Sequence, residues 1–121
     1  MRPLDGITVL DLARVLAAPY ATMLLAEMGA SVIKDEIRHY EPMVGGESAY
    51  GFTANRSKKS ITANLRHPKA QALIRDLAAG ADVVVENFTP GTLQRFGLDY
   101  ASLAAVNPRI VFLSVTGFGQ D

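Results

Sequence analysis

The residues best suited to binding a charged ligand lie between positions 81 and 95. The valines at 83–85 form a short apolar run typical of a strand buried on both faces of a parallel sheet. The run ends in a polar segment, and Thr89-Pro90 then predicts a helix start, with the threonine as N-cap and the proline in the first helical position. Backbone N–H groups at such a helix start attract anions at the carboxyl edge of a sheet, and Arg95 adds a positive charge to the same helix. Taken alone, these residues favour the simpler interpretation, an ordinary strand, loop and capped helix without a ligand.

A second group of charged residues is a candidate phosphate site. Arg56, Lys58 and Lys59 lie together before a run at 61–65 that alternates apolar and polar side chains, and Arg66 follows that run. Lysine and arginine side chains commonly bind phosphate. Composition alone favours the simpler interpretation, a solvated basic loop.

The chain lacks the residues that several other kinds of catalysis and binding require. The chain has no cysteine, which excludes disulfides and thiolate catalysis and fits a reducing compartment. His39 and His67 lack the spacing of metal ligands and are interpreted as surface histidines. No glycine-rich dinucleotide fingerprint follows the first predicted strand, where residues 16–19 read Leu-Ala-Ala-Pro, and no Walker A motif occurs.

Composition indicates a globular protein with no electrostatic preference for polyanions. The 121 residues include 12 basic and 12 acidic side chains, 49% hydrophobic and 20% charged residues. The net charge of zero gives no global attraction to nucleic acid or to an anionic membrane. The longest apolar stretch, around residues 15–25, is too short and mixed for a membrane span. Because Asp5 and Asp11 interrupt the apolar runs near the start, no signal peptide is predicted, and we expect a cytoplasmic protein.

The order of predicted elements indicates an α/β fold. We expect strands at 7–12, 31–34, 83–85 and 109–115, a short edge strand or extended segment at 61–65, and helices at 20–28, 67–79, 89 onward and 99–106. Residues 35–51 are predicted to be a loop. This order favours a largely parallel sheet with right-handed crossovers. The chain stops in a glycine-rich turn after its fourth core strand, so we expect a piece of a larger protein.

Five short blocks in register carry a resemblance that covers nearly the whole chain. They comprise residues 2–19, residues 29–36, residues 55–61, residues 85–91, and residues 107–109 with 114–120. In these blocks the chain resembles the class III CoA-transferases, the family that includes carnitine CoA-transferase, formyl-CoA transferase and α-methylacyl-CoA racemase. Each block alone is weak evidence for the family, but the five blocks occur in the same order and spacing, and this makes the resemblance specific.

The resemblance implies a fold and a binding site. Residues 1–121 would be the N-terminal part of a Rossmann-like large domain with flanking helices, in a protein that also has a small domain and forms an interlocked homodimer. CoA, or an acyl-CoA substrate, would lie across the carboxyl ends of the parallel strands. The residues that match the CoA contacts of the family are Leu16, Ala17, Arg38, Ala63, Asn64, Leu65, Arg66, Asn87, Phe88, Thr89 and Arg95.

The resemblance also implies a mechanism of nucleophilic catalysis by a carboxylate. In the family an aspartate attacks the acyl-CoA, an aspartyl-CoA thioester forms, and CoA passes to a small carboxylic acid without a metal or redox cofactor. That aspartate would lie beyond this chain, so no catalytic residue is assigned here, and Asp121 does not match it. Two alternatives stay open, an acyl-CoA racemase fragment and a non-catalytic module that binds CoA or a nucleotide.

The sequence departs from the family pattern in several places. The loop after residue 36 is shorter than usual, Ala18 replaces a usual glycine, and Thr89 stands where arginine or glycine is common. Asp35 replaces an apolar residue at the end of a buried strand, where an isolated carboxylate would be costly unless it faced solvent. These departures suggest a truncated or degraded copy, and we expect no transferase turnover from the chain alone.

Overall fold

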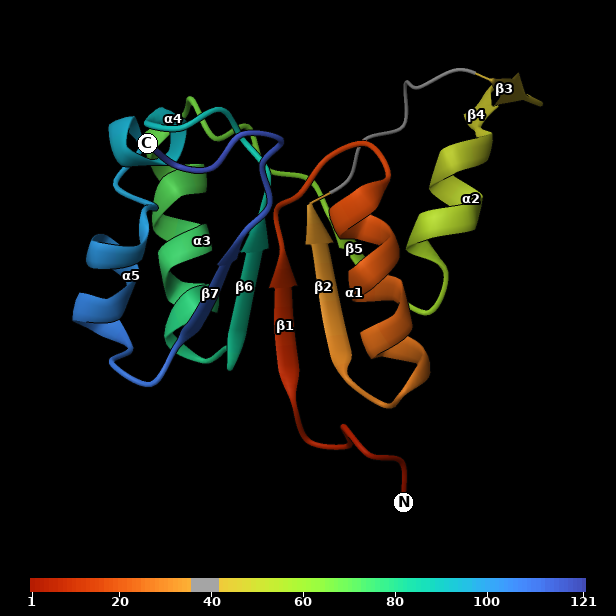
Figure 1. Cartoon of the computed structure of the whole chain (residues 1–121), viewed down its shortest axis with the longest axis horizontal. Coiled ribbons are helices and arrows are strands. Elements are labelled where there is room, and N and C mark those ends of the chain that lie inside the picture. The colour runs from red at the N-terminus through yellow and green to blue at the C-terminus, as the bar shows by residue number, and fades with distance from the viewer. Residues whose placement is uncertain (36–41) are drawn as a thin grey trace.

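The computed structural model describes residues 1–35 and 42–121, which form a sheet with helices on both faces (Figure 1). The elements in chain order are β1 (Thr8–Asp11), α1 (Ala17–Glu27), β2 (Ser31–Asp35), β3 (Met43–Val44), β4 (Glu47–Ser48), α2 (Ala49–Asn55), β5 (Lys59–Ile61), α3 (Pro68–Ala79), β6 (Val83–Glu86), α4 (Thr92–Arg95), α5 (Tyr100–Val106) and β7 (Val111–Ser114). None of the helices in these ranges is long and apolar enough to cross a membrane.

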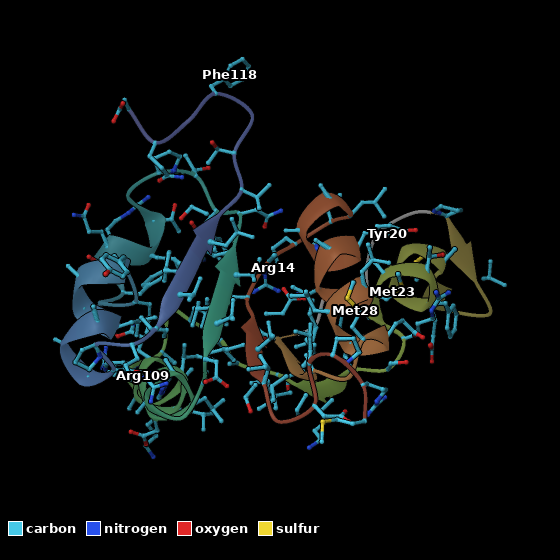
Figure 2. The ribbon with its side chains drawn as sticks, turned by 60° about the horizontal axis from the view of Figure 1, so that its bottom comes forward. Arg14, Tyr20, Met23, Met28, Arg109 and Phe118 are labelled. Carbon is cyan, nitrogen blue, oxygen red and sulfur yellow. The ribbon has the colours of Figure 1, made fainter. Side chains whose placement is uncertain are left out.

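The main sheet has five strands in the order β5-β2-β1-β6-β7, and every neighbouring pair is parallel. In β1, Val9 pairs with Val32 on one side and with Val83 on the other. Because all strands run the same way, their carboxyl ends meet at one edge, at the top of Figure 1. Figure 2 shows Phe118 beyond that edge and Arg109 before the start of β7. The expected Rossmann-like α/β fold is confirmed.

Two apolar cores cover the two faces of the sheet. One core packs the small residues Ala18 and Ala26 of α1 against Val9 and Val32. The other includes Ile74, Ala78, Leu93 and Leu103, contributed by α3, α4 and α5, with Leu10 and Val84 from the sheet. Helix α2 packs beside α1 rather than on the sheet. The apolar run at 83–85 therefore lies between two cores, as predicted.

Several predicted elements are confirmed and four are corrected. Helix α3 begins at Pro68 as predicted, with His67 as N-cap, and its Nδ1 accepts a hydrogen bond from the Lys69 amide at 3.2 Å. Helix α1 begins three residues before the predicted position 20, at Ala17. The predicted loop at 35–51 contains the end of β2, the β3–β4 hairpin and the start of α2; residues 36–41 lie outside the described ranges.

The predicted helix start at Thr89-Pro90 is wrong. Helix α4 begins at Thr92, and its N-cap is Gly91 in the left-handed conformation, with φ of 83°. With only four residues, α4 offers a far weaker anion site than the predicted helix. The edge strand predicted at 61–65 lies slightly earlier, at β5.

Candidate ligand-binding edge of the sheet

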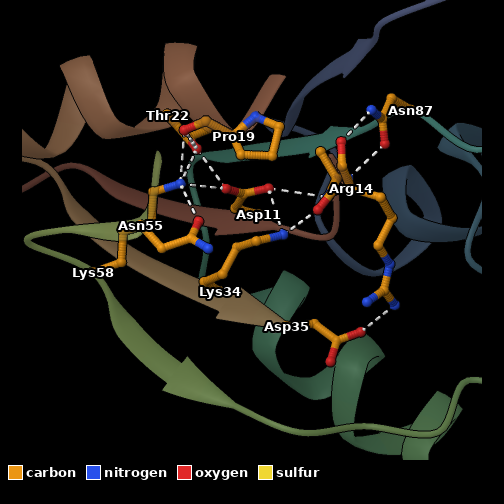
Figure 3. A network of polar contacts seen from close by, with 10 residues as sticks. Asp11, Arg14, Pro19, Thr22, Lys34, Asp35, Asn55, Lys58 and Asn87 are labelled. Atoms are coloured by element: carbon orange, nitrogen blue, oxygen red, sulfur yellow. Dashed lines mark hydrogen bonds and ion pairs between the residues drawn. The ribbon is translucent and has the colours of Figure 1, made fainter. Parts of the chain in front are cut away.

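Arg14 connects three strand ends at the carboxyl edge of the sheet (Figure 3). Its backbone N–H donates to Asn87 Oδ1 at 2.6 Å, and Asn87 Nδ2 donates back to the Arg14 carbonyl at 2.7 Å. The guanidinium Nη2 lies 2.8 Å from Asp35 Oδ2, and Cζ lies 5.4 Å from the centre of the Phe88 ring. This set of contacts, the Arg14 clamp, holds the turn after β1 against the segment after β6.

Asp35 is neither isolated nor turned to solvent. It is 2% exposed, and besides its ion pair with Arg14 it accepts a hydrogen bond from the Ala63 amide at 3.1 Å through Oδ1. A buried carboxylate is tolerated when it is paired and hydrogen-bonded. Asp35 therefore joins the segment after β5 to the same edge, and its replacement of an apolar residue is compensated by Arg14.

The turn between β1 and α1 carries backbone strain. Val15 has φ of 67°, a left-handed conformation in which a β-branched side chain is a genuine outlier. Such conformations cost about 1–3 kcal/mol and persist where surrounding contacts fix them. No side chain caps the N-terminus of α1 that follows, so the N–H groups of Ala17 and Ala18 have no side-chain partner there, and the next residue, Pro19, has no N–H.

The structure brings most of the predicted CoA contacts to this edge. Leu16 and Ala17 are exposed at the start of α1, and they line an apolar hollow of about 630 Å³ with Tyr20 and Pro42. Asn87 and Phe88 are half-buried and Thr89 is exposed, and the Arg14 clamp fixes this segment beside the β1–α1 turn.

The remaining predicted contacts differ in accessibility. Asn64 and Arg66 are exposed and joined by a hydrogen bond of 3.2 Å from the Arg66 amide to Asn64 Oδ1, with half-buried Ala63 before them. Leu65 packs into the core, and its carbonyl accepts a hydrogen bond from Gln71 Nε2 at 2.8 Å. Arg95 is exposed in the last turn of α4. Arg38 lies outside the described residues.

The basic cluster before β5 does not form one phosphate site. The Lys58 side chain is 1% exposed, and its Nζ donates to Asp11 Oδ2 at 2.9 Å, to the Pro19 carbonyl at 2.8 Å and to Asn55 Oδ1 at 3.2 Å (Figure 3). Arg56 pairs with Glu27 at 3.2 Å on the surface. Lys58 is therefore a structural cation, which corrects its interpretation as a phosphate contact.

A buried polar network surrounds Asp11, which is fully buried. Thr22 donates to Asp11 Oδ2, and the Ala13 amide donates to Oδ1 at 2.9 Å. Lys34 Nζ lies 3.5 Å from Oδ1 and donates to the Ala13 carbonyl. One carboxylate thus serves two buried ammonium groups, those of Lys34 and Lys58. Neither this network nor the Arg14 clamp was predicted from the sequence. The signal for both was that charged residues, such as Asp11 and Lys34, lie at the ends of two predicted buried strands.

The pKa of Lys34 predicts a pH dependence of stability. Burial lowers this pKa from 10.5 to about 8, although Asp11 acts in the opposite direction. Between about pH 8 and 10.5 the unfolded chain therefore binds more protons than the folded one, so the free energy of unfolding should rise with pH by up to roughly 3 kcal/mol. Urea unfolding at a series of pH values measures the rise.

Lys34→Met provides the matched comparison. Burial also lowers the pKa of Lys58, so only the difference between the two proteins reports on Lys34. We expect a flatter curve for the variant, and parallel curves would contradict the assignment.

The fold and this edge define a Rossmann-like α/β protein with a candidate anion-binding surface at the carboxyl ends of its strands. No group of three or more His, Asp or Glu side chains that could hold a metal occurs among the described residues. The model of CoA-transferase family III matches residues 4–121, and the chain belongs to that family, as the resemblance predicted.

Named relatives agree with this assignment. Human succinyl-CoA:glutarate CoA-transferase is 46% identical, over 99% of this chain and 29% of its own length. The succinate–glutarate CoA-transferase of Agrobacterium fabrum is 47% identical, over 98% of this chain and 33% of its own. The crystal structure of a CAIB/BAIF family protein from Brucella suis matches with a TM-score of 0.91 and 45% identity, over 99% of this chain and 35% of that one. The chain spans about a third of the length of these relatives.

Proposed function

We propose that this chain supplies the CoA-binding edge of a CoA-transferase that moves CoA between an acyl-CoA and a small carboxylic acid. The observation that carries the proposal is the Arg14 clamp, because it fixes the β1–α1 turn beside residues 87–89. The curated relatives are named as CoA-transferases that act on succinyl-CoA or succinate with glutarate. Two segments far apart in the sequence thus form one surface at the edge where α/β folds bind ligands.

The parts of CoA differ in charge, and the edge offers matching surfaces. The uncapped N-terminus of α1 supplies N–H groups and a positive dipole end for a phosphate, and Arg66 and Arg95 supply exposed guanidinium groups. The apolar hollow beside Leu16 and Tyr20 suits an uncharged part of the ligand. This arrangement replaces the predicted anion site at Thr89-Pro90, since α4 is too short to provide it.

The wider assignment follows from family membership and is part of the proposal. Residues 1–121 would form the N-terminal part of a large domain, in an interlocked homodimer located in the cytoplasm. Transfer would proceed through an aspartyl-CoA thioester on an aspartate outside residues 1–121, without a metal or redox cofactor. The names of the relatives support transferase over racemase activity. We expect no acyl transfer by the isolated chain.

A calorimetric titration with CoA tests the binding edge. We expect saturable binding by the full chain, and binding weaker by a factor of about ten or more in Arg95→Gln, because one charge-assisted contact contributes about 1.5–3 kcal/mol. Arg109→Gln is the matched control, since Arg109 is exposed near the opposite end of the sheet (Figure 2). Absence of binding, or equal losses in both variants, would contradict the proposed edge.

A further inference from the structure

A second hollow lies beside β5, and the four residues of the Arg14 clamp, Arg14, Asp35, Asn87 and Phe88, do not line it. Its volume is about 270 Å³, and residues from β2, β4, α2 and β5 line it. Those that matter here are Lys34, Glu47, Ser48, Lys58 and Lys59. None of the ten predicted CoA contacts that the structure describes belongs to its lining, so this hollow is distinct from that part of the proposed CoA edge.

Ser48 lines this hollow and carries a buried hydroxyl. The residue is 4% exposed, and its Oγ has no hydrogen-bond partner among the described residues. Ser48 is the N-cap of α2, yet its side chain does not cap the helix. A buried hydroxyl without a partner costs about 1–3 kcal/mol, so a ligand atom that accepts its proton would recover this loss.

Among the described residues, the lining also carries more positive than negative side chains. Lys34 and Lys58 share the single carboxylate of Asp11. Lys59 is exposed on β5 and has no ion-pair partner within the described parts of the chain. Buried charges require compensation by an opposite charge. The lowered pKa of Lys34, caused first by burial and also by repulsion from Lys58, agrees with incomplete compensation by Asp11.

We propose that this hollow binds a small oxyanion, a carboxylate or phosphate group, between the Lys59 ammonium and the Ser48 hydroxyl. Lys59 forms an ion pair with the bound anion, and Ser48 donates a hydrogen bond to it. The excess positive charge of the Lys34–Asp11–Lys58 group also attracts the anion. The Glu47 carboxylate lines the same hollow and disfavours multiply charged ligands, so the group bound should be singly charged and small.

Titrations of the isotope-labelled full chain with sodium acetate and with inorganic phosphate, followed by NMR at constant ionic strength, test this proposal. We expect saturable chemical-shift changes of the Ser48 and Lys59 amides with at least one of the two anions. The anion that binds more tightly shows whether the hollow prefers a carboxylate or a phosphate group. Sodium chloride at the same ionic strength should give no saturable shift. If neither acetate nor phosphate saturates these amides, the proposal is overturned.

Four variants locate the anion. Lys59→Gln should weaken binding about tenfold, which corresponds to a lost charge-assisted hydrogen bond, and Ser48→Ala should weaken it less. Lys69→Gln, which removes an exposed lysine at the start of α3 outside the hollow, should bind like the unmodified chain. Unchanged affinity in Lys59→Gln, or a loss confined to Arg95→Gln, would place the anion elsewhere and overturn the proposal. Because CoA is absent from these titrations, they do not depend on the proposed function.

Discussion

Replacing Asp11 with asparagine should destabilise the fold by about 3–5 kcal/mol, because two buried ammonium groups would lose the carboxylate that they share. Asparagine keeps the size of the side chain, so the effect reports on charge rather than on packing. A domain of ordinary stability has about 5–15 kcal/mol to lose, and the variant should therefore unfold at much lower urea concentration. Urea unfolding followed by circular dichroism measures the loss.

Two further variants make this result specific. Asp76→Asn removes an exposed carboxylate of α3 and should change stability by less than about 0.5 kcal/mol. Adding Lys58→Met to Asp11→Asn removes one of the uncompensated charges, so the double variant should be more stable than the sum of the single losses implies. A loss below about 1 kcal/mol in Asp11→Asn would show that the network does not hold β1, α1 and β5 together.

Replacing Arg14 with methionine should cost about 2–4 kcal/mol and weaken CoA binding. The Asp35 carboxylate, whose side chain is 3% exposed, would keep its hydrogen bond from Ala63 and lose its cation. The Phe88 ring would also lose the guanidinium above it. The backbone hydrogen bonds between Arg14 and Asn87 need no side chain from position 14, so the turn itself should persist.

A double variant separates loss of the ion pair from loss of packing. Arg14→Met with Asp35→Asn leaves no buried charge unpaired, and we expect it to recover part of the stability lost in Arg14→Met alone. Arg109→Met, at an exposed position, serves as the control. If the double variant is as unstable as the sum of its single variants, Arg14 and Asp35 do not act as a pair.

The sequence predicted the elements whose signals are local. The apolar run at 83–85 and the His67-Pro68 helix start depend on neighbouring residues, and both are confirmed. Helix α2 was missed because Gly51 and the lack of apolar periodicity hide it; it packs through fully buried Ala54. Thr89-Pro90 carried a valid helix signal, but the left-handed Gly91 delays the helix.

The sequence predicted the correct edge of the sheet for the candidate site, but it did not predict the contacts that hold the site together. Motif position alone placed Leu16 and Asn87 in one site, and the structure brings their segments together. The roles of Arg14 and Lys58 depend on partners 21 and 47 positions away in the sequence, Asp35 and Asp11. No periodicity connects residues so far apart, so their pairing follows from the parallel order of the strands.

The most direct test of the proposed CoA edge is a map of amide chemical shifts in the labelled full chain as CoA is added. The proposal predicts saturable shifts in three segments, residues 14–18, residues 63–66 and residues 87–89, with little change at Arg109. Shifts confined to the hollow around Ser48 and Lys59, or no saturable shift at all, would contradict CoA binding at the carboxyl edge of the sheet.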